Sequence, residues 1–342
     1  MNSVQHPTPH SQILANQGSA AAESYNAQTR SNRNKSHETF GYHSRKLNNW
    51  IKSLLIHLNG KGGGNVLDLA CGNGGDVAKW SGVGVGGFVG VDVADKRLEE
   101  ALRRVESFRN LRFKSYKFFM VDLGSESLSG SISQLSKTLP PKNTPHPTLP
   151  STPWSLTPSN FKLTQKFTTV SCQLALHYMM QSSTRARNCF KTISENLEIG
   201  GKFILTTMDS RFVVERLMSL GGDLLDGKDR IINIGSENLC TIRVPGETVK
   251  RIFNVDEPLT RENWYGLKYN FELLDTLSPR EVSVHLDEWL IPIELASCVM
   301  EEYGLVLEER LNFMEFFEKH KEEGGDKVRA NCWTFFRRTN AL

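Results

Sequence analysis

The sequence predicts an α/β fold with a largely parallel sheet, and three observations indicate it. Short apolar runs at 66–69, 88–91 and 118–121 suit buried parallel strands. Helix-like stretches follow the first two of these runs. Strand signals then resume at 167–172 and 202–207, with a helical pattern between them. Alternation of strand and helix is typical of a sheet whose strands are joined by helical crossovers.

The N-terminal part divides into a tail, a basic arm and a helix. Residues 1–22 are rich in Ser, Gln, Asn, Ala and Pro without periodicity, which predicts a disordered tail. Residues 25–52 carry six basic residues against one acid, with aromatics between them, and a solvated basic arm is the alternative to a binding role. Apolar residues at helical spacing predict a helix over 47–58, in which Trp50 belongs to the core.

The later elements follow from the same patterns. We expect helices at 96–108, 186–197, 212–220 and 294–303, β-like segments at 231–234, 241–244 and 249–255, and a final strand at 332–336. Between 124 and 160 the pattern breaks, and seven of the thirteen prolines lie between Pro140 and Pro158. A structureless stretch of that length inside a domain indicates an insertion.

Composition excludes several classes of protein. The 342 residues include 41 Lys plus Arg against 38 Asp plus Glu, and the net charge of +3 does not by itself indicate a nucleic-acid binder. No apolar run reaches the length of a membrane span, so we expect no membrane association. The six cysteines are scattered, which argues against a zinc site and a disulfide framework and indicates reduced thiols in the cytosol or nucleus. No metal site is expected.

The chemistry concentrates at the ends of the first three strands. The turn after the first strand reads D-x-x-x-G-x-G-G-D from Asp68 to Asp76, and its glycines let backbone N–H groups approach a ligand. The spacing is not that of the dinucleotide fingerprint. Asp92 ends the second strand, where it can accept hydrogen bonds from ribose hydroxyls, and Asp122 follows the third, in reach of an adenine amino group. Three such acids match an adenosyl ligand without a pyrophosphate.

A family resemblance narrows the expected ligand and reaction. VLDLACGNGGDVAKW resembles the first motif of class I S-adenosylmethionine-dependent methyltransferases. Together with LNNWIKSLL, SCQLALHYM, GGKFILTTMDS and YGLKYNF, it is similar to the eukaryotic mRNA cap guanine-N7 methyltransferase family. The resemblance implies a Rossmann-like class I sheet with helices on both faces, plus a β-rich elaboration on the cap side. It implies S-adenosylmethionine as cofactor, with S-adenosylhomocysteine as product, and methyl transfer to N7 of the cap guanine.

The resemblance also implies site residues, carried over position by position. Those expected around the cofactor are Lys52 at the methionine carboxylate, Asp68, Ala70, Gly72, Asp92 at the ribose, Asp122 beside the adenine, Gln173 and Tyr178. Those expected to face the cap and its phosphates are Asn48, Asn49, Lys79, Arg104, His177 and Tyr178. For Lys79 and Arg104 the alternative is ordinary exposed helix charge, and for His177 and Tyr178 it is edge packing.

The chemistry of N7 supports an orienting site. This nitrogen has a lone pair and no proton to lose, so its methylation needs alignment and no general base, and His177 and Tyr178 would orient the reactants. Positive charge moves onto the purine, which favours aromatic faces and acids around it. A carboxylate can accept from the N1–H and the N2 amino group of guanine together.

This chain departs from the family pattern at the acid that would read guanine. Leu274 occupies the expected position between Glu272 and Asp275, and we assign the role to Glu272 by a shift of the segment. About seven extra residues precede Asp287-Glu288-Trp289.

Three further departures lie elsewhere in the chain. Ala70 replaces a glycine, which is tolerable if its φ is negative. Asn73 replaces a lysine that would touch the cap, and the loss can be offset by the basic arm. Trp333 is a rough counterpart of a late cap-facing aromatic residue.

The organisation predicted is a tail, 1–22, and one methyltransferase domain, 23–342. That domain would contain the basic arm and helix (23–59), the insertion (124–160) and a substrate-side elaboration (about 210–290). Two alternatives remain open: a methyltransferase acting on another small or protein substrate, and a catalytically weakened RNA-binding relative. The resemblance implies capped mRNA 5' ends as partner, capping enzyme or the RNA polymerase II machinery as further partners, and a nuclear location.

Overall fold

The computed structural model describes a defined part of the chain. The described residues are 22, 23, 26, 41–125, 128, 132–137, 154–159, 166–235, 240–273, 287–321 and 333–338. Most of the predicted basic arm and the residues Leu274 and Asp275 therefore lie outside the described residues.

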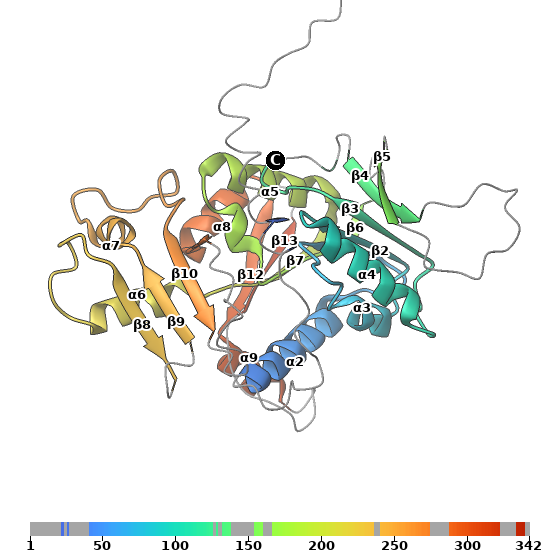
Figure 1. Cartoon of the computed structure of the whole chain (residues 1–342), viewed down its shortest axis with the longest axis horizontal. Coiled ribbons are helices and arrows are strands. Elements are labelled where there is room, and N and C mark those ends of the chain that lie inside the picture. Colours follow the sequence, from blue (N-terminus) through green and yellow to red (C-terminus); the bar gives the residue numbers. More distant parts are fainter. Residues whose placement is uncertain are drawn as a thin grey trace, which may run out of the picture.

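A nine-stranded sheet forms the centre of the molecule (Figure 1). Its strands, in spatial order, are β12 (Leu305–Leu311), β13 (Trp333–Arg338), β7 (Leu197–Thr206), β6 (Phe167–Gln173), β1 (Asn65–Leu69), β2 (Gly87–Asp92), β3 (Ser115–Met120), β4 (Ile132–Lys137) and β5 (Trp154–Ser159). The five from β7 to β3 run parallel, and the pairs outside them are antiparallel. The predicted parallel α/β sheet is confirmed. The order reverses between β1 and β6, which is where such sheets bind ligands.

Helices cover both faces of this sheet because its strand residues alternate. In β1, Val66 packs with α2 (Gly41–Asn59), α3 (Val77–Val83) and α4 (Asp95–Ser107), whereas Leu67 packs with α5 (Ser183–Asn196) and α8 (Ile293–Glu301). The same alternation recurs at Phe203 and Ile204 of β7. Strands buried on both faces read as continuous apolar runs, which is why the sequence revealed them.

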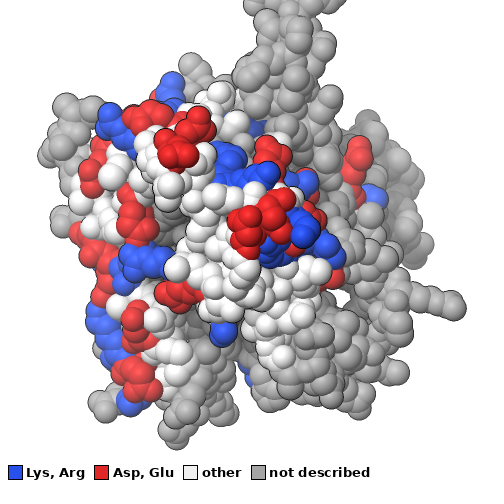
Figure 2. Space-filling view, turned by 90° about the vertical axis from the view of Figure 1, so that its left-hand side faces the viewer, with Lys and Arg blue, Asp and Glu red and all other residues white. Residues whose placement is uncertain are grey.

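A second, four-stranded antiparallel sheet lies at one end of the molecule (Figure 1). Its order is β11 (Asp287–Trp289), β10 (Lys268–Leu273), β9 (Cys240–Val244) and β8 (Arg230–Ile234), and it packs on α6 (Ser210–Ser219) and α7 (Gly246–Phe253). Figure 2 views this end, where basic and acidic side chains are interspersed over the described surface.

Two predictions of local structure were wrong. The segment 249–255 was expected to be a strand, but residues 249–253 belong to helix α7. Val249, Ile252 and Phe253 have the i, i+3, i+4 spacing of a helix face, which overrides their β propensity. The insertion 124–160 is not structureless, because β4 and β5 extend the sheet from β3. The sequence also missed the short helix η2 (Leu176–Met179), β11, β12 and α9 (Phe313–His320).

Helix α2 is anchored by its aromatic residue, as predicted. Trp50 packs against Phe316 and Phe317 in the middle of α9, with its ring centroid 6.3 and 5.5 Å from theirs. Lys52 lies two residues after Trp50 in α2. Its side chain pairs with Asp76, at the end of the glycine-rich turn that follows β1. No helix in the described ranges has the length and apolar character of a membrane span.

Candidate active site

The glycine-rich turn after β1 bends sharply toward α3. Gly72 and Gly74 have φ of 52° and 66°, and Ala70 has φ of 51°. The condition under which Ala70 would be tolerated without strain, a negative φ, is not met, because the turn places this residue in the left-handed region. An L-residue there carries backbone strain, and such strain gathers at functional sites.

A cleft of about 670 Å³ opens beside this turn, at the carboxyl ends of β1, β2, β3 and β6. Its volume is that of a site for a small organic ligand. Nine of the residues predicted from the sequence line it: Lys52, Asp68, Ala70, Gly72, Asp92, Arg104, Asp122, Gln173 and Tyr178. Five predicted residues do not: Asn48, Asn49, Lys79, His177 and Glu272.

Asp68 is the most strongly perturbed acid of the cleft. Burial, together with the charge of Asp76, raises the pKa of Asp68 to about 8, although the hydroxyl of Ser171 donates a hydrogen bond to it. Ser171 in turn accepts from the side-chain amide of Gln173 at 3.1 Å, and Gln173 accepts from Thr206 at 3.1 Å. This chain of hydrogen bonds fixes Gln173 and Asp68 on neighbouring strands.

Asp76 holds two lysines at the start of α3. One of its oxygens accepts from Lys52 at 2.9 Å and the other from Lys79 at 2.6 Å. Burial disfavours the ionised form of Asp76, but the two lysines outweigh it and lower its pKa. Lys79 also donates to the carbonyl of Gly75 and to Asn49. Lys79 and Asn49 are therefore adjacent to the turn, just outside the cleft.

Asp92 is fixed by two backbone donors. Its Oδ2 accepts from the N–H of Gly72 at 2.8 Å and its Oδ1 from the N–H of Ala94 at 2.9 Å. Burial raises its pKa, and these hydrogen bonds and the charge of Arg97 oppose the rise. Arg97 lines the cleft two helical turns before Arg104, on the same face of α4, and no role was predicted for it.

Asp122 is bound by an arginine that the sequence analysis did not identify. Arg185 of α5 donates to both oxygens of Asp122, at 2.8 and 3.0 Å, and lines the same cleft. The side chain of Arg185 is 5% exposed and that of Asp122 is 15% exposed. Sixty-three positions separate the two residues, and no local pattern around Arg185 distinguishes it from an ordinary helix cation.

His177 and Tyr178 lie on η2, the short helix that follows β6, with ring centroids 4.2 Å apart. The hydroxyl of Tyr178 donates to Glu288 of β11 at 3.3 Å, and Nε2 of His177 lies 3.6 Å from the other oxygen of Glu288. Burial lowers the pKa of His177, and Glu288 opposes this only in part. Apart from that contact, neither buried ring nitrogen of His177 has a hydrogen-bond partner among the described residues.

The prediction that Glu272 belongs to this group is not supported by its position. Glu272 lies on β10, paired in register with Thr241 of β9, and does not line the cleft. Glu288 is the acid that the structure places against His177 and Tyr178, on the edge strand of the same sheet. Glu288 does not itself line the cleft, and its contact with Tyr178, which does, brings it to the border of the cleft.

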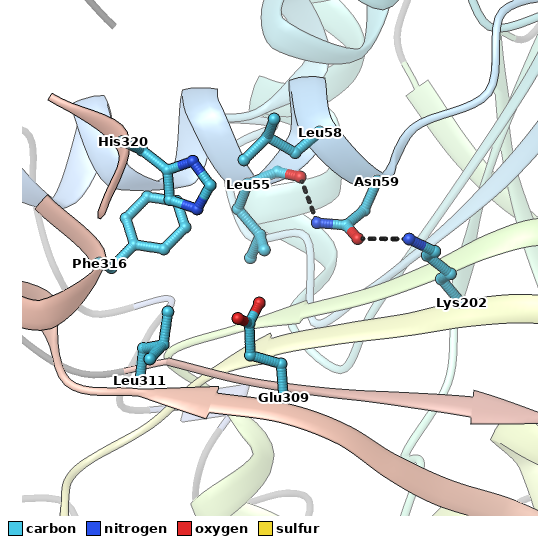
Figure 3. Close-up of a pocket in the computed structure, with 8 residues that line it drawn as sticks. All are labelled: Leu55, Leu58, Asn59, Lys202, Glu309, Leu311, Phe316 and His320. Carbon is cyan, nitrogen blue, oxygen red and sulfur yellow. Dashed lines mark hydrogen bonds between the residues drawn. The ribbon is translucent and has the colours of Figure 1, made fainter. Parts of the chain in front are cut away.

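A second hollow of about 190 Å³ lies between α2, β7, β12 and α9 (Figure 3). It is smaller than typical sites for organic ligands. Two of its polar residues are joined by hydrogen bonds: Lys202 donates to Asn59 at 3.1 Å, and Asn59 donates to the carbonyl of Leu55 at 3.0 Å. None of its residues lines the larger cleft. Among the described residues, no group of three or more His, Cys, Asp or Glu could hold a metal ion.

Two solved methyltransferases are similar to this chain at low sequence identity. The CcbJ methyltransferase from Streptomyces caelestis is 12% identical, with a TM-score of 0.49 over 86% of this chain and 96% of that one. A glycopeptide N-methyltransferase, MtfA, solved with S-adenosylmethionine, is 12% identical, with a TM-score of 0.43 over 85% of this chain and 94% of that one.

Comparison of sequences is more specific. mRNA cap guanine-N(7) methyltransferase 1 of Oryza sativa subsp. japonica is 30% identical over 82% of this chain and 63% of its own length. The mRNA cap guanine-N(7) methyltransferase of Candida glabrata is 27% identical over 89% of this chain and 63% of its own length. This chain thus matches less than two thirds of these relatives. The model of the mRNA (guanine-N(7))-methyltransferase domain matches residues 10–331, and the chain therefore belongs to that family.

Proposed function

We propose that this chain transfers a methyl group from S-adenosylmethionine to N7 of the guanine that caps the 5' end of mRNA. The observation that carries the proposal is the juxtaposition of two groups of residues. Three acids of successive strand ends line one cleft, and the His177–Tyr178–Glu288 cluster adjoins it through Tyr178. The family and the names of the relatives support the same reaction.

The cleft residues fit S-adenosylmethionine. Its volume suits a ligand of that size, and the buried carboxyl groups of Asp68 and Asp92 offer oxygens for an ammonium group and for ribose hydroxyls. A bound ammonium group would favour the ionised form of Asp68. Lys52, with its Asp76 partner, would face the methionine carboxylate beside Ala70 and Gly72, and Asp122 would lie beside the adenine. When bound, this cofactor supplies an electrophilic methyl group on a sulfonium centre.

The cluster around Glu288 would hold the guanine. A carboxylate facing the base can accept from its N1–H and N2 amino group together, and Glu288 takes this role in the proposal in place of Glu272. The lowered pKa of His177 keeps its imidazole neutral near pH 7. A neutral ring, the aromatic face of Tyr178 and a carboxylate all tolerate the positive charge that develops on the purine.

The cationic side chains beside the turn would hold the phosphates of the cap. Arg104 lines the cleft, and Lys79 lies at its rim with Asn49, next to Asn48 on α2. Orientation then accounts for the reaction, since alignment of nucleophile and methyl group needs no proton transfer.

Methyl transfer to unmethylated capped RNA, with the product identified at N7, tests the proposal. Glu288→Gln should lower kcat/KM by about 100-fold, because the site then loses the carboxylate that pairs with the guanine edge. Glu272→Gln, the same change on the neighbouring strand, is the matched control and should stay within about threefold. If Glu272→Gln is the inactive variant, our assignment of Glu288 is wrong.

Two other outcomes would favour the alternative functions. Transfer to another substrate, with none to capped RNA, would indicate a different methyltransferase. Binding of capped RNA without any transfer would indicate an RNA-binding relative that has lost turnover.

We infer, from the relatives alone, a nuclear place of action and association with capping enzyme or the RNA polymerase II machinery. A fluorescent fusion would test the location, and co-purification with these two candidates would test the association. Exclusion of the fusion from the nucleus would contradict the first inference.

A further inference from the structure

The carboxylate of Asp122 has its hydrogen-bonding capacity filled by its own surroundings. Oδ1 accepts from Arg185 Nη2 at 2.8 Å and from the N–H of Gly124 at 3.0 Å. Oδ2 accepts from Arg185 Nη1 at 3.0 Å and from the hydroxyl of Ser125 at 2.7 Å. An ionised carboxylate offers about four lone-pair sites, so these four donors occupy them.

The arginine that binds Asp122 lies in a place shaped for it. A Cβ built on Gly124 would lie 2.4 Å from Cζ of Arg185, so the guanidinium packs directly against Gly124 and would have to shift to admit a larger residue. Ser125 accepts a further hydrogen bond from Arg185 at 2.9 Å, and Asn188 of α5 donates to the carbonyl of Gly124 at 3.0 Å. Helix α5 and the loop after β3 are therefore joined into one unit.

This unit lines the cleft at its third strand end. Asp122, Leu123 and Arg185 border the cleft next to Asp92 and Val93 of the second strand end. If the ribose of the cofactor lies at Asp92, its purine extends toward Arg185 and Asp122. An adenine amino group is a hydrogen-bond donor and needs an acceptor, which an arginine side chain does not offer.

We propose that Arg185 is a specificity-determining residue of the cofactor cleft, a proposal that rests on the proposed function. By occupying both oxygens of Asp122, it prevents that carboxylate from accepting a hydrogen bond from the adenine amino group. The planar guanidinium offers the purine a flat surface to pack against, but it has no hydrogen-bond acceptor for the amino group. The cleft then recognises the purine by its shape, and it tolerates a 6-oxo group where adenine has its amino group.

Binding of two probes by the full chain tests this inference. S-adenosylhomocysteine and S-inosylhomocysteine carry an amino group and an oxo group at purine position 6, and the oxo form also has a proton on N1. Isothermal titration calorimetry measures the binding of both. The wild-type chain should bind them with Kd values within about threefold of each other, because neither hydrogen-bonds to Asp122. Arg185→Gln frees the carboxylate, which should then favour the amino probe over the oxo probe by about tenfold or more.

Two further variants control the interpretation. Arg187→Gln removes an arginine of the same helix that pairs with Glu302 at the surface, and its Kd ratio should equal that of the wild type. Arg185→Gln combined with Asp122→Asn should lose the tenfold preference, because the freed acceptor charge is gone.

The wild-type ratio is decisive even if the Arg185 variants do not fold. A wild-type preference of tenfold or more for the amino probe overturns the inference, and so does a folded Arg185→Gln variant that shows no preference. If the wild type binds neither probe, the proposed function itself fails. Binding of S-adenosylhomocysteine with strong rejection of the oxo probe leaves that function standing and refutes only the role of Arg185.

Discussion

The strained position of Ala70 makes a quantitative prediction about stability. Its φ of 51° lies in the left-handed region, where an L-residue costs about 1–2 kcal/mol and a glycine costs almost nothing. Ala70→Gly removes that cost. The substitution also makes the unfolded chain more flexible, which costs about 0.4–1 kcal/mol, and it loses one partly buried methyl group. The net expectation is a variant about 0.5 kcal/mol more stable than the wild type.

A matched substitution isolates the backbone effect. Ala78→Gly makes the same chemical change at an exposed position of α3, where glycine is unfavourable by about 1 kcal/mol. Both substitutions increase the flexibility of the unfolded chain by the same amount. The free energies of unfolding of the two variants should therefore differ by about 1.5 kcal/mol, with Ala70→Gly the more stable. Urea unfolding followed by tryptophan fluorescence measures both values, provided that the m-values agree. Equal destabilisation by the two substitutions would show that Ala70 carries no strain, and the reasoning would fail.

Two further predictions concern the pH dependence of stability and the packing of the loop after β3. The pKa of Asp68 is about 8 in the folded chain and 3.8 without the fold, so between about pH 4 and 8 the folded state keeps a proton that the unfolded state has lost. The contribution of Asp68 to the free energy of unfolding should therefore fall as pH rises through that window, and Asp68→Asn should flatten the slope in urea titrations from pH 5 to 8.5. An unchanged slope would contradict the burial of an ionisable Asp68. Gly124→Ala places a methyl group 2.4 Å from the guanidinium carbon of Arg185, and it should destabilise the chain by about 1–3 kcal/mol in the same assay. A neutral effect would mean that Arg185 does not lie against Gly124.

Sequence reasoning was most successful where neighbouring residues along the chain determine the structure. The apolar runs predicted β1, β2, β3, β6 and β7 because strands buried on both faces are continuous in sequence. It was wrong at α7, where β-branched residues are equally compatible with a strand and the helical spacing was overlooked. It also missed β4 and β5, whose Pro-rich surroundings are typical of loops.

The order of residues along the chain was enough to predict which acids line the cleft. Parallel strands bring their carboxyl ends to one edge, so acids at successive strand ends must converge there whatever the rest of the chain does. This is why Asp68, Asp92 and Asp122 could be placed together before their geometry was known. The glycine-rich turn followed in the same way, although the sign of φ at Ala70 did not.

Only the tertiary structure decided which side chains those acids and aromatics contact. Glu288 reaches Tyr178 across 110 positions, and Arg185 reaches Asp122 across 63. Such pairs depend on how the four-stranded sheet packs on η2 and how α5 lies on the main sheet, and neither arrangement leaves a periodic signal in the sequence. An acid on an edge strand and a basic residue on a helix look like ordinary surface charges until packing buries them. Local periodicity therefore located the cleft, and long-range packing brought Arg185 into its wall and Glu288 to its border.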